Sequence, residues 1–246
     1  PLRLVGSEMC IRDRYQEMER DERVFVYGLG VDDPILLYGT GKGLVDRFGG
    51  DRVFDTPIAE DGMTGFGVGA AMGGMRPIHV HIRMDFMLLA MNQLVNLAAK
   101  AHYMYGGAVS VPLVVRSIIG RSWGQGAQHS QGLHALFMHI PGLRVVAPTT
   151  PYDAKGTLVE SIRDNNPVVF VEHRLLHKQR GYVPEEPYTV PIGQSRTLSH
   201  GDDVTIVGIS HALVECVRAA HALKTEGISA EVIDPLWLAP LSIGPI

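Results

Sequence analysis

One acidic side chain, Glu60, follows a short apolar segment and a proline, and small residues dominate the chain directly after it. Phe54 opens the apolar segment, Pro57 interrupts it, and glycines and alanines fill much of residues 62–74. This pattern predicts a strand-to-helix junction, which is where ligands of open α/β sheets bind. A carboxylate at a helix start can simply complement the helix dipole. If burial keeps it protonated, it could instead hydrogen-bond a ring nitrogen of a ligand.

Two other side chains could take part in chemistry. His129 lies in a loop after Gly124 and Gly126, ahead of a predicted helix. A single histidine is more often structural, yet a group that titrates near neutral pH suits proton transfer. Phe86 ends a β-like run, and an aromatic residue at a strand end usually belongs to the core. The residue types alone leave both alternatives open for each side chain.

Alternation along the same run places His79, His81 and Arg83 on one face of the predicted strand. Two histidines suggest zinc, but the sequence places no third ligand nearby, so zinc is the weaker interpretation. An arginine there could neutralise an anionic group of a substrate. We therefore treat Arg83 as a candidate substrate contact.

The elements that must position these residues alternate between apolar, β-branched runs and helical stretches, which predicts βαβ crossovers. The expected fold class is α/β, with an open, mostly parallel sheet, helices on both faces and the start of a second α/β domain. Strands are predicted at 24–27, 78–82, 113–116, 144–146 and 168–172. Helices are predicted at 62–73, 86–103, 131–137 and 151–163.

A second unit is predicted near the end of the chain. The run 203–209 has the composition of a buried strand, 212–225 that of a helix and 230–234 that of a second strand, which together make one βαβ unit with a parallel strand pair. The segment 184–191 is punctuated by prolines, so it cannot be helical. It predicts an exposed link between two domains.

The composition of the 246 residues narrows the possible functions. Hydrophobic residues make up 46% and charged residues 20%, as in ordinary globular proteins. A net charge of −4 without a dense basic run argues against a nucleic-acid surface. Two cysteines exclude a disulfide framework, no apolar run approaches the roughly 18 residues of a membrane span, and the start has no apolar signal core. We therefore expect a cytoplasmic location and no binding to nucleic acid or membrane.

Two segments carry a family resemblance: Thr-Pro-Ile-Ala-Glu at 56–60 and Gly-Ala-Gln-His-Ser-Gln at 126–131. With their spacing they resemble the β subunit of the thiamine-diphosphate-dependent 2-oxo acid dehydrogenases of the pyruvate, branched-chain and acetoin types. The likeness runs from about Tyr15 to the last residue. It implies an enzyme subunit that helps to decarboxylate a 2-oxo acid and to transfer the acyl group to a lipoyl group.

The resemblance also implies roles for individual residues. Glu60 would hold the aminopyrimidine ring of thiamine diphosphate and so help to activate its reactive carbon. Ile58 and Phe86 would contact the cofactor, with Phe86 stacked on the ring. His129 would lie at the active site, facing an α subunit and the incoming lipoyl arm.

A structural potassium site is a further implication. Its ligands would be Asp164, Asn166 and the backbone oxygens of Leu113 and Ser161. From the residues alone, the segment 164–167 is a turn after a helix. Hard oxygen ligands of this kind suit such an ion.

The chain departs from the family pattern near Phe86. Val80 stands where the family usually has an acidic residue, and Leu89 where it has a glutamine. Together with Arg83, these departures put the identity of the substrate in doubt more than that of the cofactor. Which 2-oxo acid is used therefore stays open at this stage.

A partner subunit is implied as well. The superfamily binds the diphosphate and magnesium through a Gly-Asp-Gly motif followed by paired asparagines, and Gly201-Asp202-Asp203 does not satisfy it. The glycine-rich run 39–43 fails the spacing of a phosphate loop, because position 43 is glycine. We expect an α subunit to hold the magnesium in an α2β2 heterotetramer that works with a lipoyl acyltransferase core.

These inferences predict the following organisation. Residues 1–14 form a leader that is not native, 15–183 a pyrimidine-binding domain of the transketolase type, 184–200 a linker, and 201–246 a truncated transketolase C-terminal-like domain.

Two other functions compete with this interpretation. One is a two-chain transketolase-like enzyme that acts on a sugar-type or acyloin substrate. The other is a non-catalytic binding module, against which the joint presence of Glu60, Phe86 and His129 argues.

The glycines at 65, 69 and 73 recur along one helix face. Glycine costs up to roughly 1 kcal/mol relative to alanine in a helix, so they predict close packing, either on the chain's own sheet or, as we favour, across a subunit interface.

Overall fold

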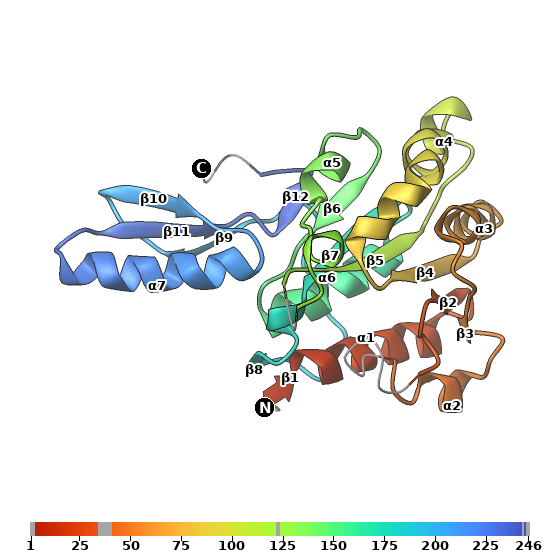
Figure 1. The fold of residues 1–246 in the computed structure, drawn as a ribbon, viewed down its shortest axis with the longest axis horizontal. Coiled ribbons are helices and arrows are strands. Elements are labelled where there is room, and N and C mark those ends of the chain that lie inside the picture. The colour runs from red at the N-terminus through yellow and green to blue at the C-terminus, as the bar shows by residue number, and fades with distance from the viewer. Residues whose placement is uncertain (1–2, 34–40, 122–123, 243, 245–246) are drawn as a thin grey trace.

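The centre of the molecule is a seven-stranded sheet (Figure 1). The computed structural model describes residues 3–33, 41–121, 124–242 and 244, so the glycine-rich run 39–43 lies partly outside the described residues. The strand order is β12-β6-β7-β5-β4-β2-β3, and all neighbours pair in parallel except β12, which is antiparallel to β6. The strands are β2 Val24–Gly28, β3 Val53–Asp55, β4 Arg76–His81, β5 Val114–Ile119, β6 Arg144–Val146, β7 Val168–His173 and β12 Trp237–Ala239. The predicted α/β class with a mostly parallel sheet is confirmed.

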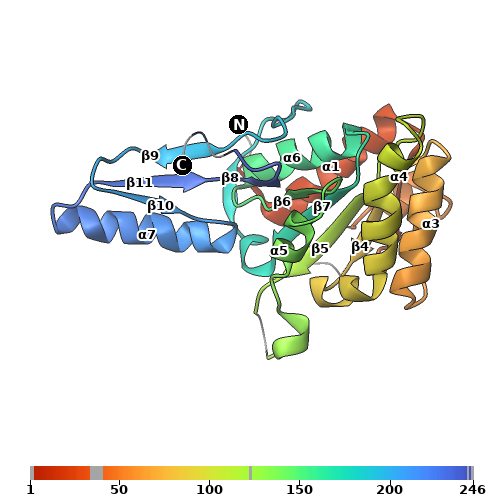
Figure 2. The same ribbon diagram turned by 90° about the horizontal axis from the view of Figure 1, so that it is seen from above.

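Helices cover both faces of this sheet (Figure 2). One face carries α1 Gly6–Arg20, α2 Leu44–Phe48 and α6 Pro151–Arg163. The other carries α3 Glu60–Met72, α4 Ala99–Met104 and α5 His134–Met138. Helix α6 has the predicted bounds, because Thr150 accepts a hydrogen bond from the backbone N–H of Asp153 (3.1 Å) and a proline occupies the first helical position. Among the described residues, no helix is both long and apolar enough to cross a membrane.

Burial on both faces explains why the strands are continuously apolar. Successive residues of a strand point to opposite faces. In β5, Val114 and Ile118 belong to the core cluster beneath α1 and α6, whereas Val115 and Ile119 belong to the cluster beneath α3 and α5. The sheet is therefore the shared wall of two cores.

The single helix predicted at 86–103 is wrong. The chain forms a 3-10 helix at Met84–Ala90, a π-helix at Asn92–Ala98 and then α4. The helix predicted at 131–137 begins later than expected, at His134. The two irregular segments are joined, because Asp85 Oδ1 accepts a hydrogen bond from the backbone N–H of Gln131 (3.3 Å). Such 3-10 and π segments are frequent at functional sites.

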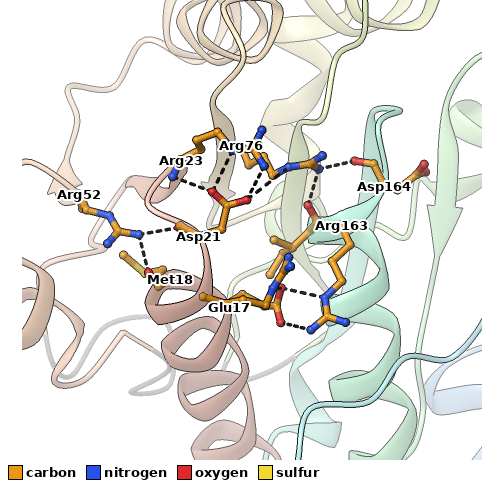
Figure 3. A network of polar contacts seen from close by, with 10 residues as sticks. Glu17, Met18, Asp21, Arg23, Arg52, Arg76, Arg163 and Asp164 are labelled. Carbon is orange, nitrogen blue, oxygen red and sulfur yellow. Dashed lines mark hydrogen bonds and ion pairs between the residues drawn. The ribbon is translucent and has the colours of Figure 1, made fainter.

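Arginine side chains fasten α1 to its surroundings (Figure 3). Arg163 of α6 donates two hydrogen bonds, of 2.6 and 3.0 Å, to the buried carboxylate of Glu17 in α1. Arg52, directly before β3, donates to the backbone oxygens of Met18, Asp21 and Val24. These oxygens lie at and after the C-terminal end of α1, where helix carbonyls lack partners within the helix. Helix α1 is thus fixed to both α6 and the edge of the sheet.

A smaller unit extends from one side of the main sheet (Figures 1 and 2). It contains β9 Arg196–Ser199, β10 Val204–Val207, β11 Ala230–Asp234 and α7 His211–Thr225. The predicted parallel pair β10–β11 is present, and β9 joins it antiparallel to β11. The segment 184–200, predicted as a linker, therefore contains a strand. The prediction that the first strand is buried is wrong, since Val204 and Val207, which point to opposite faces of β10, are both exposed.

Both ends of the chain add strands to distant parts of the fold. After β11 the chain returns to the main sheet as β12, whose Trp237 is fully buried. At the other end, β1 Arg3–Val5 pairs antiparallel with β8 Arg180–Tyr182. Helix α1 starts directly after β1, so the leader predicted for residues 1–14 runs without a break into the helix that holds Glu17.

The last residue of β11, Asp234, has a buried carboxyl group. Burial raises its pKa to about 7, and the nearby Asp153 carboxylate contributes in the same direction. The folded state therefore binds a proton that the unfolded chain releases at lower pH, so the free energy of unfolding falls as pH rises from about 4 to about 7.

We expect Asp234→Asn to remove this loss, because an amide oxygen can still accept the hydrogen bond from the backbone N–H of Leu236 (2.9 Å). Urea denaturation at several pH values should show wild type and variant converging near pH 4 and differing by a few kcal/mol at pH 8, at roughly 1.4 kcal/mol per pKa unit. If the free energies of unfolding of wild type and variant changed with pH in parallel, the raised pKa of Asp234 would be contradicted.

Candidate active site

Glu60 is the first residue of α3 and follows the turn after β3. Its carboxylate is half-buried and lies at the positive end of the helix. Two contacts shape this edge of the sheet. Asp55 Oδ1 accepts from the backbone N–H of Gly30 (2.6 Å). Gly28 has φ +137°, and a Cβ there would lie 2.3 Å from the backbone oxygen of Val80, so only glycine lets β2 end this close to β4.

A cavity of about 440 Å³ opens beside Glu60. Its wall combines the ends of several strands and the segments that follow them, which is the usual ligand position in an open parallel sheet. The structure brings together five residues selected from the sequence: Ile58, Glu60, Arg83, Phe86 and His129. The cavity is also lined by Leu29, His81, Ile82 and Leu89.

Both aromatic and ionisable side chains line the cavity. The rings of Phe86 and His129 meet edge to face, with centroids 5.2 Å apart. Ile58 is 80% exposed at the rim. A flat ring could therefore lie against Phe86 with one edge toward a carboxylate and another toward an imidazole, which fits an aromatic cofactor bearing ring nitrogens.

Two buried side chains, those of Arg174 and Asp85, hold the loop of His129 in place. Arg174, directly after β7, donates from Nη2 to the backbone oxygen of His129 (2.7 Å). Asp85 accepts from the side-chain amide of Gln131 (2.7 Å) and from its backbone N–H. The loop is thus positioned by β7 on one side and by the segment after β4 on the other.

Arg83 is oriented at the wall of the same cavity. Its Nη1 donates to the backbone oxygen of Ile82 (2.7 Å) and its Nε to Gln125 Oε1 (3.0 Å). The same Gln125 oxygen accepts from Arg174 Nη1 (2.7 Å). Two guanidinium groups therefore share one amide oxygen beside the candidate site.

His79 and His81 lie on one face of β4, as alternation predicted, and both are buried. Thr64 Oγ1 of α3 lies 3.4 Å from His79 Nδ1 and 3.2 Å from His81 Nε2. Burial lowers the pKa of His81 to about 4 and that of His79 well below its usual range, so both rings are neutral at pH 7. Within the described residues, no group of three potential ligands could hold a metal ion, so the zinc interpretation gains no support.

A second, very small cavity of about 10 Å³ lies behind Glu60. Glu60, His79 and His81 all line it, together with Val80. This volume is close to the minimum that holds one water molecule. Val80, where this chain departs from the family pattern, therefore lines the same small cavity as the candidate carboxylate.

The four residues predicted as potassium ligands gather at the end of α6. Asp164 pairs with Arg144 through its carboxylate, and its backbone oxygen accepts from Arg76 Nη1 (3.0 Å; Figure 3). Asn166 donates to Asp164 Oδ1 (2.9 Å), the backbone oxygen of Leu113 accepts from Val168 (2.8 Å), and Ser161 is buried in the last turn of α6. Two guanidinium groups already supply positive charge here, so the set as it stands does not fit an additional cation.

Comparison with known proteins places the chain in a family. Residues 13–179 match the family model described as "Transketolase, pyrimidine binding domain", and residues 193–246 match "Transketolase, C-terminal domain". The chain is 43% identical to the pyruvate dehydrogenase E1 component subunit beta of Dictyostelium discoideum over 96% of its own length and 68% of that protein. The chain belongs to the family of 2-oxo acid dehydrogenase β subunits. The resemblance inferred from the sequence motifs is confirmed.

Other similar proteins belong to the same family, but their names refer to different substrates. An acetoin:2,6-dichlorophenolindophenol oxidoreductase subunit beta from Cupriavidus necator is 43% identical over 94% of this chain and 71% of its own length. A 2-oxoisovalerate dehydrogenase subunit beta from Bacillus subtilis is 42% identical over 92% of this chain and 69% of its own. A solved split-gene transketolase described as an inactive beta4 tetramer superposes with a TM-score of 0.76 at 21% identity, covering 98% of this chain and 74% of that one, which supports the fold.

Three residues of the site escaped the sequence analysis. Asp85 and Arg174 are buried and act through hydrogen bonds to a loop more than 40 positions away. Arg174 carries a usable signal, because it directly follows an apolar strand, and strand ends in parallel sheets converge at the ligand edge. Gln125 carries none, since its importance comes only from the two arginines that meet at its oxygen.

We expect Asp85→Ala to loosen the loop of His129 without unfolding the sheet. A hydrogen bond to a charged group contributes about 1.5–3 kcal/mol, so amide hydrogen exchange across residues 124–133 should accelerate roughly tenfold or more. Asp85→Asn, which keeps an acceptor oxygen, is the matched control and should change exchange much less. Equal exchange in all three proteins would show that the loop is held by other contacts.

Proposed function

We propose that this chain is the β subunit of a thiamine-diphosphate-dependent 2-oxo acid dehydrogenase and supplies the aminopyrimidine-binding half of its active site. The observation that carries the proposal is the shared cavity of Glu60, Phe86 and His129, formed by segments far apart in the sequence. Family membership supports the same conclusion. The reaction would be oxidative decarboxylation of a 2-oxo acid followed by acyl transfer to a lipoyl group.

Each residue of the cavity has a distinct task in this proposal. Glu60 hydrogen-bonds a ring nitrogen of the aminopyrimidine, while Phe86 and Ile58 pack against the ring and orient it. His129 gives or takes a proton at the bound substrate, which suits an imidazole near neutral pH. The cofactor, when bound, supplies the carbanion-stabilising chemistry, and the protein supplies position and electrostatics.

A partner subunit completes the site in this proposal. The chain lacks the diphosphate and magnesium motif, Ile58 is exposed and Glu60 is only partly buried. An α subunit that covers this edge would supply the magnesium and would exclude solvent from Glu60 and Ile58. The proposed assembly is an α2β2 heterotetramer in the cytoplasm that delivers its acyl group to a lipoyl acyltransferase core.

The surface of α3 and of the helical segments from Met84 to Met104 supports such a partner. Large apolar side chains are exposed on these neighbouring segments, and exposed apolar surface of this kind can mark interaction sites. They include Phe66, Met72, Leu89, Leu97, Tyr103 and Met104. An added Cβ at Gly65 would meet the side chain of Gln93, and one at Gly73 would meet backbone oxygens of the same helix, whereas one at Gly69 would have no atom within 4 Å.

Potassium remains a prediction from the resemblance and is not part of the proposed cofactor set. Arg76 and Arg144 already contact the oxygens of Asp164. Unfolding curves in potassium and in sodium chloride at equal ionic strength would test the prediction directly.

We expect Glu60→Gln and Glu60→Ala to leave the fold intact and to slow hydrogen–deuterium exchange at the reactive carbon of the cofactor in the assembled enzyme. Loss of a positioned proton-transfer group typically costs about 10²–10⁴-fold in rate. Asp61→Asn is the matched control, because it removes the neighbouring exposed carboxylate of the same helical turn. Wild-type exchange rates in the Glu60 variants would contradict the proposed role of Glu60 in activating the cofactor.

We expect Gly69→Leu to weaken assembly with the α subunit while secondary structure survives, because a bulky side chain would stand in the close contact proposed for this face. Sedimentation velocity with the α partner measures the change. Ala219→Leu, on the exposed surface of α7, controls for an added leucine elsewhere. Unchanged assembly in the Gly69 variant would remove α3 from the interface.

A further inference from the structure

A buried polar network lies next to Glu60. Thr64, one turn later in α3, is fully buried, and its Oγ1 lies 3.4 Å from His79 Nδ1 and 3.2 Å from His81 Nε2. Residues four positions apart lie on the same face of a helix, so Glu60 and Thr64 face the same side. Glu60 and both histidines also line the cavity of about 10 Å³. The network and the candidate carboxylate therefore border one small space.

Packing alone does not account for the two imidazole rings. The ring of His79 stacks on that of Tyr27, with centroids 4.4 Å apart, and lies 4.3 Å from that of His81. An apolar ring could make the same contacts, whereas a buried imidazole loses hydrogen bonds to water that must be replaced. Within the described part of the chain, both rings have Thr64 as their one hydrogen-bond partner. One nitrogen of each ring therefore still requires a partner.

The protons of the network determine what the two rings can offer. Burial lowers the pKa of both histidines, so each ring is neutral at pH 7 and has one N–H and one bare nitrogen. The hydroxyl of Thr64 has one proton, so it donates to one ring and accepts from the other. The ring protons then lie either both on Nδ1 or both on Nε2. In each arrangement His79 Nε2 and His81 Nδ1 present one donor and one acceptor.

A water molecule matches this pair of nitrogens. The volume of the small cavity is close to the minimum for one water, and a buried water makes about three hydrogen bonds. A water bound to the N–H of one ring and the bare nitrogen of the other keeps one donor and one acceptor. It can therefore donate to an ionised carboxylate or accept from a protonated carboxyl group. Thr56 adds a hydroxyl to the wall, and the remaining side chains are apolar: Leu29, Pro57, Ala59, Met63 and Val80.

We propose that a single water in this small cavity joins the carboxyl group of Glu60 to His79 and His81 and closes a ring of hydrogen bonds with Thr64. The proposal rests on the function proposed above, in which Glu60 bonds the cofactor ring. The network gives Glu60 a hydrogen-bond partner in both protonation states, so neither state leaves a polar group unsatisfied. Thr64, His79 and His81 are positioning residues, because they act on the cofactor through Glu60.

Substitutions at Thr64 test the effect on the cofactor. Thr64→Val keeps the shape of the side chain and removes the hydroxyl, whereas Thr64→Ser keeps the hydroxyl. The full-length protein is assembled with its α partner and loaded with thiamine diphosphate and magnesium. We expect Thr64→Val to slow hydrogen–deuterium exchange at the reactive carbon by about tenfold, and Thr64→Ser to stay within about threefold of wild type.

Thr157→Val is the matched control, because Thr157 is a fully buried threonine of α6 that does not line the small cavity. It should leave the exchange rate unchanged. A wild-type rate in Thr64→Val, or an equal loss in Thr64→Val and Thr64→Ser, would overturn the proposal.

A second measurement does not depend on turnover and uses the unaltered Thr64. Nitrogen-15 solid-state NMR of the assembled protein, with the histidines of this chain labelled, reports which ring nitrogens carry protons. His79→Phe and His81→Phe assign the signals. We expect both rings to have the same tautomer, and Glu60→Ala to shift the signals of His79 Nε2 and His81 Nδ1, whereas Asp61→Asn should not. Different tautomers, or signals that do not respond to Glu60→Ala, would contradict the network.

These measurements separate the proposal from the function on which it rests. Wild-type exchange rates in the Glu60 variants, with the NMR response intact, would count against the role of Glu60 in the dehydrogenase and leave the network in place. A crystal structure of the assembled protein that shows no ordered water between Glu60 and the two imidazole rings would overturn the network itself.

Discussion

The parallel register of β2, β3 and β4 is the constraint on which the candidate site depends. Val26 of β2 pairs with Val53 of β3 on one side and Ile78 of β4 on the other. Parallel pairing in this register brings the carboxyl ends of the three strands to one edge, where Glu60 and Arg83 follow within a few residues. A one-residue shift of β4 would turn His79 and His81 away from Thr64 and exchange the two faces of the strand.

The ionisable side chains at this edge of the sheet lie in two layers. The histidines of β4 are buried beneath α3 and stay neutral, whereas Glu60, Arg83 and His129 surround the open cavity. One strand farther along, Arg116 of β5 pairs with Glu172 of β7, both buried, and the arginine helps to hold the pKa of Glu172 well below its usual range. Removing either member of a buried ion pair is strongly destabilising, so this pair is a structural element, and its Glu172 precedes Arg174 by two residues.

The sequence predicted those parts of the fold in which local pattern and tertiary environment agree. Helix α6 has a capping threonine, a proline at its first turn and an amphipathic pattern, and it was found at both ends. The strands of the sheet core were recognisable because burial on both faces makes them rich in β-branched apolar residues. Glu60, Phe86 and His129 were found because they lie in motifs of characteristic composition.

Asp85, Gln125 and Arg174 could not be found as a group, since their importance arises from contacts between distant segments. The exposure of β10 was equally hidden, because an apolar run does not reveal whether a second layer covers it.

The return of the chain from β11 to β12 has a consequence for biosynthesis. Strand β12 forms one edge of the main sheet, and its removal would leave unpaired those hydrogen-bonding groups of β6 that face away from β7. Because Trp237 is more than sixty positions beyond β7, a ribosome must synthesise β9, β10, α7 and β11 before β12 can join the large sheet. During that interval β6 is an exposed edge, which is the type of surface that invites pairing with another chain. The order of synthesis therefore makes the early stages of folding sensitive to crowding and to chaperones that shield a nascent sheet.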